Sequence, residues 1–111
     1  MADFAYYYME YTLDIYSKGP EQLLSSLALN CKARRLEKGY SRSRLSKLTG
    51  VPAPTIEHFE MTGKISLESF CKLAIEFGYF EEIAALLSKS KYTTGSELEI
   101  INKNKNRKKG R

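Results

Sequence analysis

The chain has 111 residues and a formal net charge of +5, with 18 Lys and Arg against 13 Asp and Glu. This length accommodates one small domain and excludes folds of about 250 residues, such as large barrels and complete dinucleotide-binding folds. The two cysteines are too few for a disulfide framework, no apolar run approaches the roughly 20 residues that cross a bilayer, and the N-terminus lacks the basic-then-apolar order of a secretory signal. We therefore expect a cytoplasmic protein with no membrane partner, in which Cys31 and Cys71 are core thiols.

Charge is distributed unevenly along the chain. Residues 32–47 carry seven basic residues against Glu37, and residues 89–111 carry eight basic residues against two glutamates, so each block has a formal charge of +6. The intervening residues 48–88 carry six glutamates against two lysines, a charge of −4. Two basic blocks favour a polyanionic partner, and the acidic residues 68–82 are expected to face away from it.

Residues 1–19 are rich in tyrosine and show neither a period of about two nor a period of about 3.6. We assign them no conformation and expect a flexible N-terminal arm. Met9 is an alternative first residue, which would make residues 1–8 extraneous. The other interpretation of residues 1–8 is a mobile terminus.

From Pro20 to Ser88 the apolar residues follow helical spacing. Proline suits a first helical turn, serine caps an N-terminus, and glycine commonly follows the last turn. These signals predict five helices. The first covers residues 20–37 and is closed by Lys38-Gly39, and the second covers residues 42–48 and is capped by Ser41. The third follows the Thr49-Gly50-Val51-Pro52 turn and ends before Gly63, the fourth is capped by Ser66 and stopped by Gly78, and a short fifth helix covers residues 80–87.

No strand-type alternation interrupts residues 20–88, so we predict an all-α domain there. Beyond Ser88 the periodicity fades, apart from a turn of helix around residues 97–101. The basic end of the chain is therefore expected to form a disordered tail over residues 89–111.

Patterns that carry catalysis or metal binding do not occur in the sequence. His58 is the only histidine, and no glycine-rich nucleophile elbow accompanies it. Cys31, Cys71 and His58 are isolated and lack the paired spacing of zinc ligands. No run matches a phosphate-binding loop or a dinucleotide fingerprint. The sequence therefore predicts a binding protein rather than an enzyme, with no catalytic residue, metal or cofactor.

The second and third predicted helices, joined by a short turn, have the layout of a helix-turn-helix. The run from Arg35 to Val51, followed by Thr55-Ile56 and Phe59-Glu60, resembles the Cro/repressor type (Xre family) of helix-turn-helix domain over about residues 24–88. The resemblance implies a five-helix DNA-binding domain braced by an ion pair between Arg35 and Glu60. The alternative is that these are two unrelated surface charges.

The resemblance also assigns the positions that face DNA. It places Ala53, Pro54, Thr55, Glu57 and His58 against the bases, and Arg42, Arg44, Lys47, Met61 and Lys64 near the DNA backbone.

The chain departs from the usual family pattern at Ala53 and Pro54, whose side chains donate no hydrogen bond to a base edge. We therefore expect DNA shape to supply part of the specificity. In this interpretation Ala53 contacts a thymine methyl group, Thr55 a phosphate or methyl group, and His58 a base acceptor. The alternatives are a solvated His58 and, for Arg42, Arg44 and Lys47, an ordinary charged helix face.

A narrower resemblance extends downstream. The run from Thr62 to Phe70, the residues Leu73-Ala74 and Phe77-Gly78-Tyr79, and the basic end are similar to HipB-like antitoxins, which are encoded beside HipA-family kinases. Such proteins are dimeric operon repressors that bind the toxin. The resemblance implies a transcriptional regulator that binds a palindromic operator in double-stranded DNA as a homodimer, with a HipA-like kinase toxin as a further partner.

The dimer surface is expected at Ile83, Leu86 and Leu87, unless these residues complete the monomer core. Two other functions stay open. The chain is either a protein-interaction module that neutralises a kinase toxin with little DNA readout of its own, or a sequence-independent nucleic-acid binder that acts through its basic tail.

Overall fold

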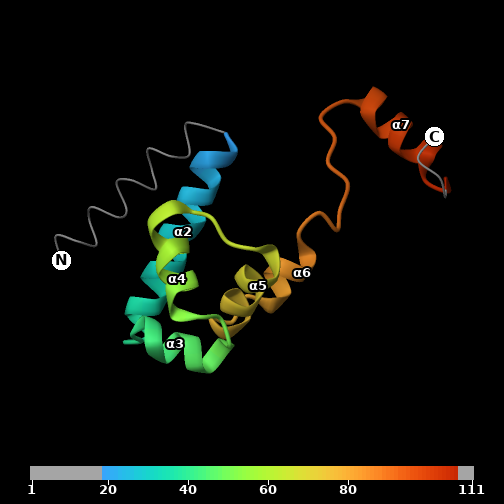
Figure 1. Ribbon diagram of the computed structural model, residues 1–111. Helices are drawn as coiled ribbons and strands as arrows, with labels where there is room; N and C mark the ends of the chain where they lie inside the picture. The colour runs from blue at the N-terminus through green and yellow to red at the C-terminus, as the bar shows by residue number, and fades with distance from the viewer. Residues whose placement is uncertain (1–18, 108–111) are drawn as a thin grey trace. The chain divides into compact units, whose positions relative to one another are not determined.

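The computed structural model describes residues 19–107, and every regular element in this range is an α-helix (Figure 1). The all-α prediction is therefore confirmed for these residues. The chain divides into two units, residues 1–80 and residues 81–111. The predicted N-terminal arm, apart from Gly19, lies outside the described residues. The helices are α2 (Pro20–Glu37), α3 (Arg42–Thr49), α4 (Ala53–Thr62), α5 (Leu67–Glu76), α6 (Phe80–Ala85) and α7 (Gly95–Asn104).

Local chemistry fixes where α2 ends and α3 begins. Gly39 has a φ of 73° in the left-handed region, where glycine carries no Cβ penalty. Its N–H donates to the Leu36 carbonyl at 2.9 Å, and the Tyr40 N–H donates to the Arg35 carbonyl at 3.1 Å. This pair of bonds satisfies the last carbonyls of α2. Ser41 then caps α3, because its Oγ accepts a hydrogen bond from the Arg44 N–H at 3.0 Å.

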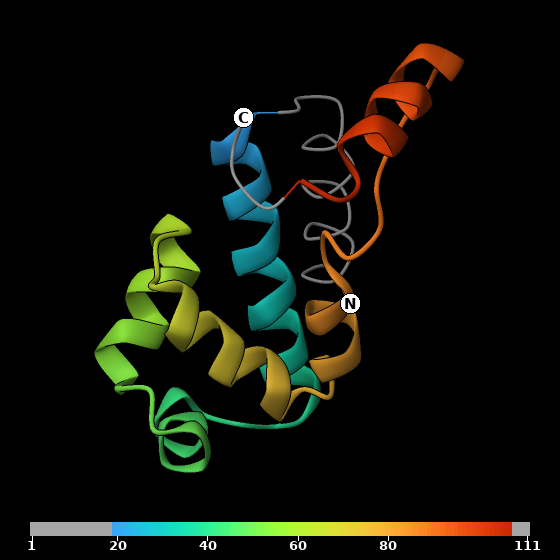
Figure 2. The ribbon, with the colours of Figure 1, turned by 90° about the vertical axis from the view of Figure 1, so that its right-hand side faces the viewer.

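The first unit is built around a small hydrophobic core. Its largest fully buried side chains are those of Phe59, Leu45, Ile56, Leu73 and Val51, and each contributes roughly 1.5–3 kcal/mol through burial. Ala28 and Cys31 bring α2 into the same core, and the Phe59 ring meets the Phe70 ring edge-on at 6.0 Å. Through these residues α4 packs against α2 and α3, and α5 packs against α3 (Figure 2).

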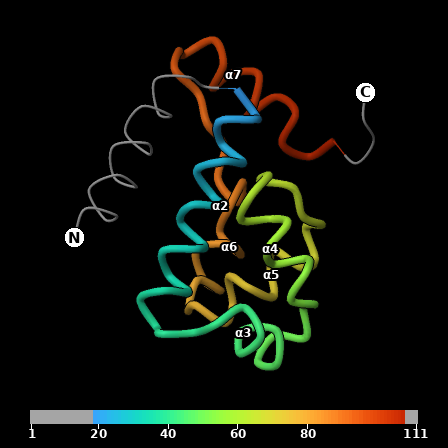
Figure 3. Tube along the Cα trace, turned by 60° about the vertical axis from the view of Figure 1, so that its left-hand side comes forward, coloured from blue at the N-terminus to red at the C-terminus, as the bar shows by residue number. Residues whose placement is uncertain are grey.

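A three-residue turn, Gly50-Val51-Pro52, joins α3 to α4 (Figure 3). Gly50 has a φ of 81°, and the Val51 side chain is 1% exposed. The Thr49 hydroxyl accepts a hydrogen bond from the Val51 N–H at 3.2 Å. The turn is therefore held to the core by its central residue, which fixes α4 relative to α3.

The second unit differs from the predicted disordered tail. The helix α7 spans ten residues, where the sequence indicated a single turn around residues 97–101. Thr94 caps α7 by accepting from the Glu97 N–H at 3.1 Å, and the Glu97 carboxylate accepts from the Thr93 N–H at 2.7 Å. This reciprocal capping satisfies donors at the start of the helix, and the apolar spacing alone gave no sign of it.

The predicted fifth helix also differs from the structure. Residues 80–87 were expected to form a helix, but α6 ends at Ala85. Leu87 has a φ of 64°, which does not continue a helix. No residue of α6 is buried, so its side chains add nothing to the hydrophobic core. Among the described residues, no helix is both long enough and apolar enough to cross a membrane.

Candidate nucleic-acid interface

The residues Arg35 on α2 and Glu60 on α4 form a buried ion pair. Arg35 Nε donates to Glu60 Oε2 at 2.7 Å and Nη2 donates to Oε1 at 2.9 Å, which is the paired geometry that a planar guanidinium makes with a carboxylate. The two side chains are 7% and 1% exposed. A third donor, Nη1, reaches the Tyr40 carbonyl at 2.9 Å. The structure thus brings together the two residues that the sequence paired, and the alternative of unrelated surface charges does not describe them.

A second arginine, Arg42 at the start of α3, joins the same carboxylate. Arg42 Nε donates to Glu60 Oε1 at 3.0 Å, and Nη1 lies 3.4 Å from Glu57 Oε2. The sequence assigned Arg42 to the DNA backbone and did not anticipate these contacts. The sequence feature that pointed to these contacts was the presence of two carboxylates, three residues apart, on one predicted helix. Arg42 therefore fastens α3 to α4, while Arg35 fastens α2 to α4.

One face of α4, which Glu57 shares with the edge of this network, is exposed. Pro54, Glu57, His58 and Met61 follow the i, i+3, i+4, i+7 spacing of one helix face, and all four are exposed. The Met61 side chain is the most prominent apolar group there, with 75% of its surface accessible. Ala53 and Thr55, which the sequence placed against the bases, are half-buried at the start of α4.

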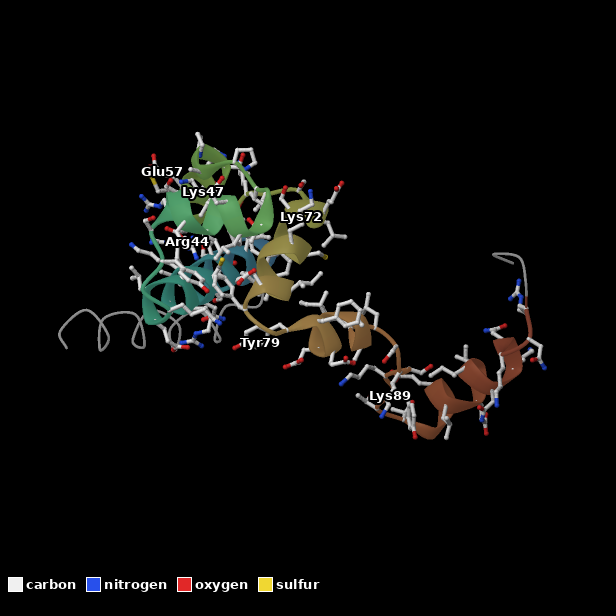
Figure 4. The ribbon with its side chains drawn as sticks, turned by 90° about the horizontal axis from the view of Figure 1, so that it is seen from below. Arg44, Lys47, Glu57, Lys72, Tyr79 and Lys89 are labelled. Carbon is white, nitrogen blue, oxygen red and sulfur yellow. The ribbon has the colours of Figure 1, made fainter. Side chains whose placement is uncertain are left out.

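The first unit also carries three exposed basic side chains on or next to α3 and α4. Arg44 and Lys47 lie on α3 (Figure 4), and Lys64 follows the end of α4. The Glu57 carboxylate is the acidic group on the exposed face of α4, and it is paired with Arg42 at the edge of that face. The arrangement offers one helix surface for shape recognition and flanking cations for phosphate oxygens.

The two cysteines are the remaining candidates for chemistry among the described residues. Burial raises the pKa of the Cys31 thiol from 9.0 to about 12, with a further contribution from the negative charge of Glu60, so the thiol stays protonated. Cys71 is half-buried and, like Cys31, forms no disulfide. Within residues 19–107 no group of three His, Cys, Asp or Glu side chains is arranged to hold a metal ion.

The expected dimer residues lie on and after α6. Ile83 is half-buried, Leu86 is 66% exposed and Leu87 is fully exposed. Both the role in dimerisation and the alternative, a contribution to the monomer core, remain predictions.

The sequence matches no protein-family model, and no curated protein or solved structure is detectably similar to it. The assignment of a function therefore rests on the residues and their geometry.

Proposed function

We propose that the first unit is a helix-turn-helix DNA-binding domain of the Cro/repressor type and that the protein is a transcriptional regulator. In this proposal α4 enters the major groove and α3 lies across the DNA backbone. One observation carries it. The Arg35–Glu60–Arg42 network holds α4 rigidly against α2 and α3, while the face formed by Pro54, Glu57, His58 and Met61 remains exposed.

Flanking charge supports the same proposal. Arg44, Lys47 and Lys64 provide exposed cations beside the exposed face of α4, where a helix in the major groove meets the phosphates on either side. These residues supply affinity without sequence information, and the side chains of α4 supply the readout. Because Ala53 and Pro54 donate no side-chain hydrogen bonds, a share of the specificity comes from DNA shape.

A homodimer fits the uncovered leucines after α6. Two copies that meet through Ile83, Leu86 and Leu87 would place two α4 helices on a palindromic operator, with half-sites about one helical turn apart. We propose further that the protein represses its own operon as a HipB-like antitoxin, with a HipA-family kinase as its toxin. The exposure of Leu86 and Leu87 supports the dimer but not the antitoxin role, which rests on the sequence resemblance.

The test is binding to the DNA upstream of the protein's own gene, compared with a scrambled duplex of equal length and composition, at about 0.15 M salt where electrostatic attraction is not exaggerated. We expect the upstream fragment to bind about 10³-fold more tightly or better, as dedicated regulators do. A ratio near one would contradict the proposal.

A matched pair of variants shows whether the flanking cations take part. Arg44→Ala combined with Lys47→Ala removes two exposed cations beside α4, and should weaken binding to both duplexes while lowering the slope of log K against log[salt] by about two. Lys72→Ala, which removes a lysine paired with Glu68 on α5, should leave both affinities unchanged.

A second function is favoured by the apolar character of the same α4 face. Pro54 and the 75%-exposed Met61 lie at its two ends and offer contact area rather than hydrogen bonds. These features suit a module that binds and neutralises a kinase toxin. If the upstream fragment shows no preference, titration calorimetry with a purified HipA-family kinase tests this function. Met61→Asp should then abolish the heat of binding, while Leu67→Asp, on the equally exposed start of α5, should not.

A further inference from the structure

The helix α4 carries two carboxylates with opposite environments. The Glu60 side chain is 1% exposed and binds two guanidinium groups, whereas the Glu57 side chain is 57% exposed and lies one turn earlier. Glu60 therefore has a structural role. Glu57 is the anionic group that a DNA duplex would meet when α4 enters the major groove.

A carboxylate in the major groove restricts the base that it can face. It accepts hydrogen bonds and donates none, so it is repelled by the O6 and N7 acceptors of guanine and by the O4 acceptor of thymine. Adenine presents a donor beside its N7 acceptor. Cytosine presents its N4 amino group alone, and it is the base whose major-groove edge suits a carboxylate best.

Arg42 is the charged partner of Glu57. Arg42 Nη1 lies 3.4 Å from Glu57 Oε2, and Arg42 is itself anchored through Nε to Glu60 Oε1 at 3.0 Å. The guanidinium, whose side chain is 33% exposed, balances the charge of Glu57 and so lowers the cost of bringing a carboxylate near phosphates. The two carboxylate oxygens together accept about four hydrogen bonds, so pairing with Arg42 leaves capacity for a base.

We propose that Glu57 reads a cytosine in each operator half-site and that Arg42 is its positioning residue. The inference rests on the proposed function, because it assumes that α4 enters the major groove. It adds the identity of one base and assigns to Arg42 a role in specificity in place of a phosphate contact.

The test begins with the tightest-binding duplex selected by the full-length protein from a random-sequence library. Every base pair of that duplex is then substituted in turn, and binding is measured for the wild type and for Glu57→Gln. The wild type should prefer cytosine at one position of each half-site by about tenfold to a hundredfold. Glu57→Gln should move the preference at that position to adenine, because a glutamine side chain donates to N7 and accepts from N6. Glu68→Gln, on the exposed start of α5, should leave the whole profile unchanged.

The variants Arg42→Gln and Arg42→Lys test positioning. If Arg42 acts through Glu57, Arg42→Gln should lower the preference for cytosine at that one position and keep the preferences at the other positions. Arg42→Lys should retain part of the preference for cytosine, because it keeps the cation. Because Arg42 also binds Glu60, Arg42→Gln can lower affinity for every duplex. A uniform loss that leaves the preference for cytosine unchanged would overturn the assignment of Arg42 as a positioning residue.

The outcomes separate this inference from the proposed function. If the wild type shows base preferences but Glu57→Gln does not change them, the inference fails and the proposed function stands. If the wild type shows no base preference at any position, both the proposed function and the inference fail. Far-UV circular dichroism of each variant confirms that it is folded.

Discussion

At the scale of single residues, one carboxylate connects three helices. Glu60 on α4 binds Arg35 on α2 and Arg42 on α3, and its side chain is almost fully buried. Removing one partner of a buried pair leaves an uncompensated charge in the interior. The stability of the first unit should therefore depend on Glu60 far more than on the exposed Glu57.

Glu60→Ala is expected to lower the free energy of unfolding by about 3–5 kcal/mol, because Arg35 then stays buried without its counter-ion. Urea denaturation followed by circular dichroism measures this change. Glu57→Ala is the control. It removes an exposed partner of Arg42 and should cost no more than about 1 kcal/mol. Equal costs for the two variants would contradict the bracing role of Glu60.

The two cysteines should react differently with a thiol reagent. Only the thiolate is nucleophilic, and burial raises the pKa of Cys31 to about 12, so Cys31 should be unreactive in the folded protein at pH 8. The half-buried Cys71 should be labelled first. Mass spectrometry of the labelled peptides checks the order, and rapid labelling of Cys31 would contradict its burial.

The stability of the protein should also depend on the titration of Cys31. Because the pKa of Cys31 is raised above 9.0, its contribution to stability is fully present below pH 9 and is lost as the pH rises towards 12.

At the scale of elements, the sequence predicted the helices best where a capping residue marks an end. Ser41 and Ser66 cap α3 and α5 as expected, and Gly63 follows α4. Only one turn of α7 was anticipated, because its apolar residues are few and its capping by Thr94 and Glu97 depends on side-chain hydrogen bonds.

The candidate site could be predicted only in part. The pairing of Arg35 with Glu60 followed from a resemblance that fixes both positions. The contacts of Arg42 did not, because a basic residue at the start of a helix is compatible with either a phosphate or a neighbouring carboxylate. Choosing between them requires the packing of α3 against α4, which no local pattern encodes.

Two glycines that end helices should differ in their tolerance of a side chain. Gly50 and Gly63 have φ values of 81° and 79°, so alanine is strained by about 1–2 kcal/mol at either position. A Cβ at Gly63 would also lie 3.2 Å from Cβ and from the carbonyl carbon of Leu24 on α2, whereas a Cβ at Gly50 meets nothing within 4 Å. We expect Gly63→Ala to lose about 1–3 kcal/mol more than Gly50→Ala in thermal or urea unfolding. Equal losses would show that α4 does not approach α2 closely at this point.

At the scale of the whole molecule, the basic charge lies in two parts of the chain. Arg44 and Lys47 are exposed on α3 in the first unit, whereas residues 89–111 carry a formal charge of +6 within the unit that contains α7. Neither α6 nor α7 buries a residue. If the proposed function holds, the second unit should raise affinity for any polyanion, and the first unit should supply the specificity.

Deletion of residues 89–111 changes the net charge of the chain from +5 to −1, because the deleted segment holds eight basic and two acidic residues. Affinity for the upstream fragment and for the scrambled duplex should fall by similar factors, and their ratio should be kept. Fluorescence anisotropy at several salt concentrations measures both affinities. If the full-length chain binds the two duplexes equally and the deletion abolishes binding to both, the protein is instead a sequence-independent binder that acts through its tail.

The most direct test of the proposed DNA-binding role of α4 is a map of backbone amide chemical shifts, by nuclear magnetic resonance, as the selected duplex is added to the full-length chain. A helix-turn-helix regulator should show its largest changes at the amides of Ala53 and of residues 55–58, and around Arg44, Lys47 and Lys64, with small changes on α5. Changes confined to residues 89–107, with the signals of α3 and α4 unmoved, would contradict the assignment of α4 as the DNA-reading helix.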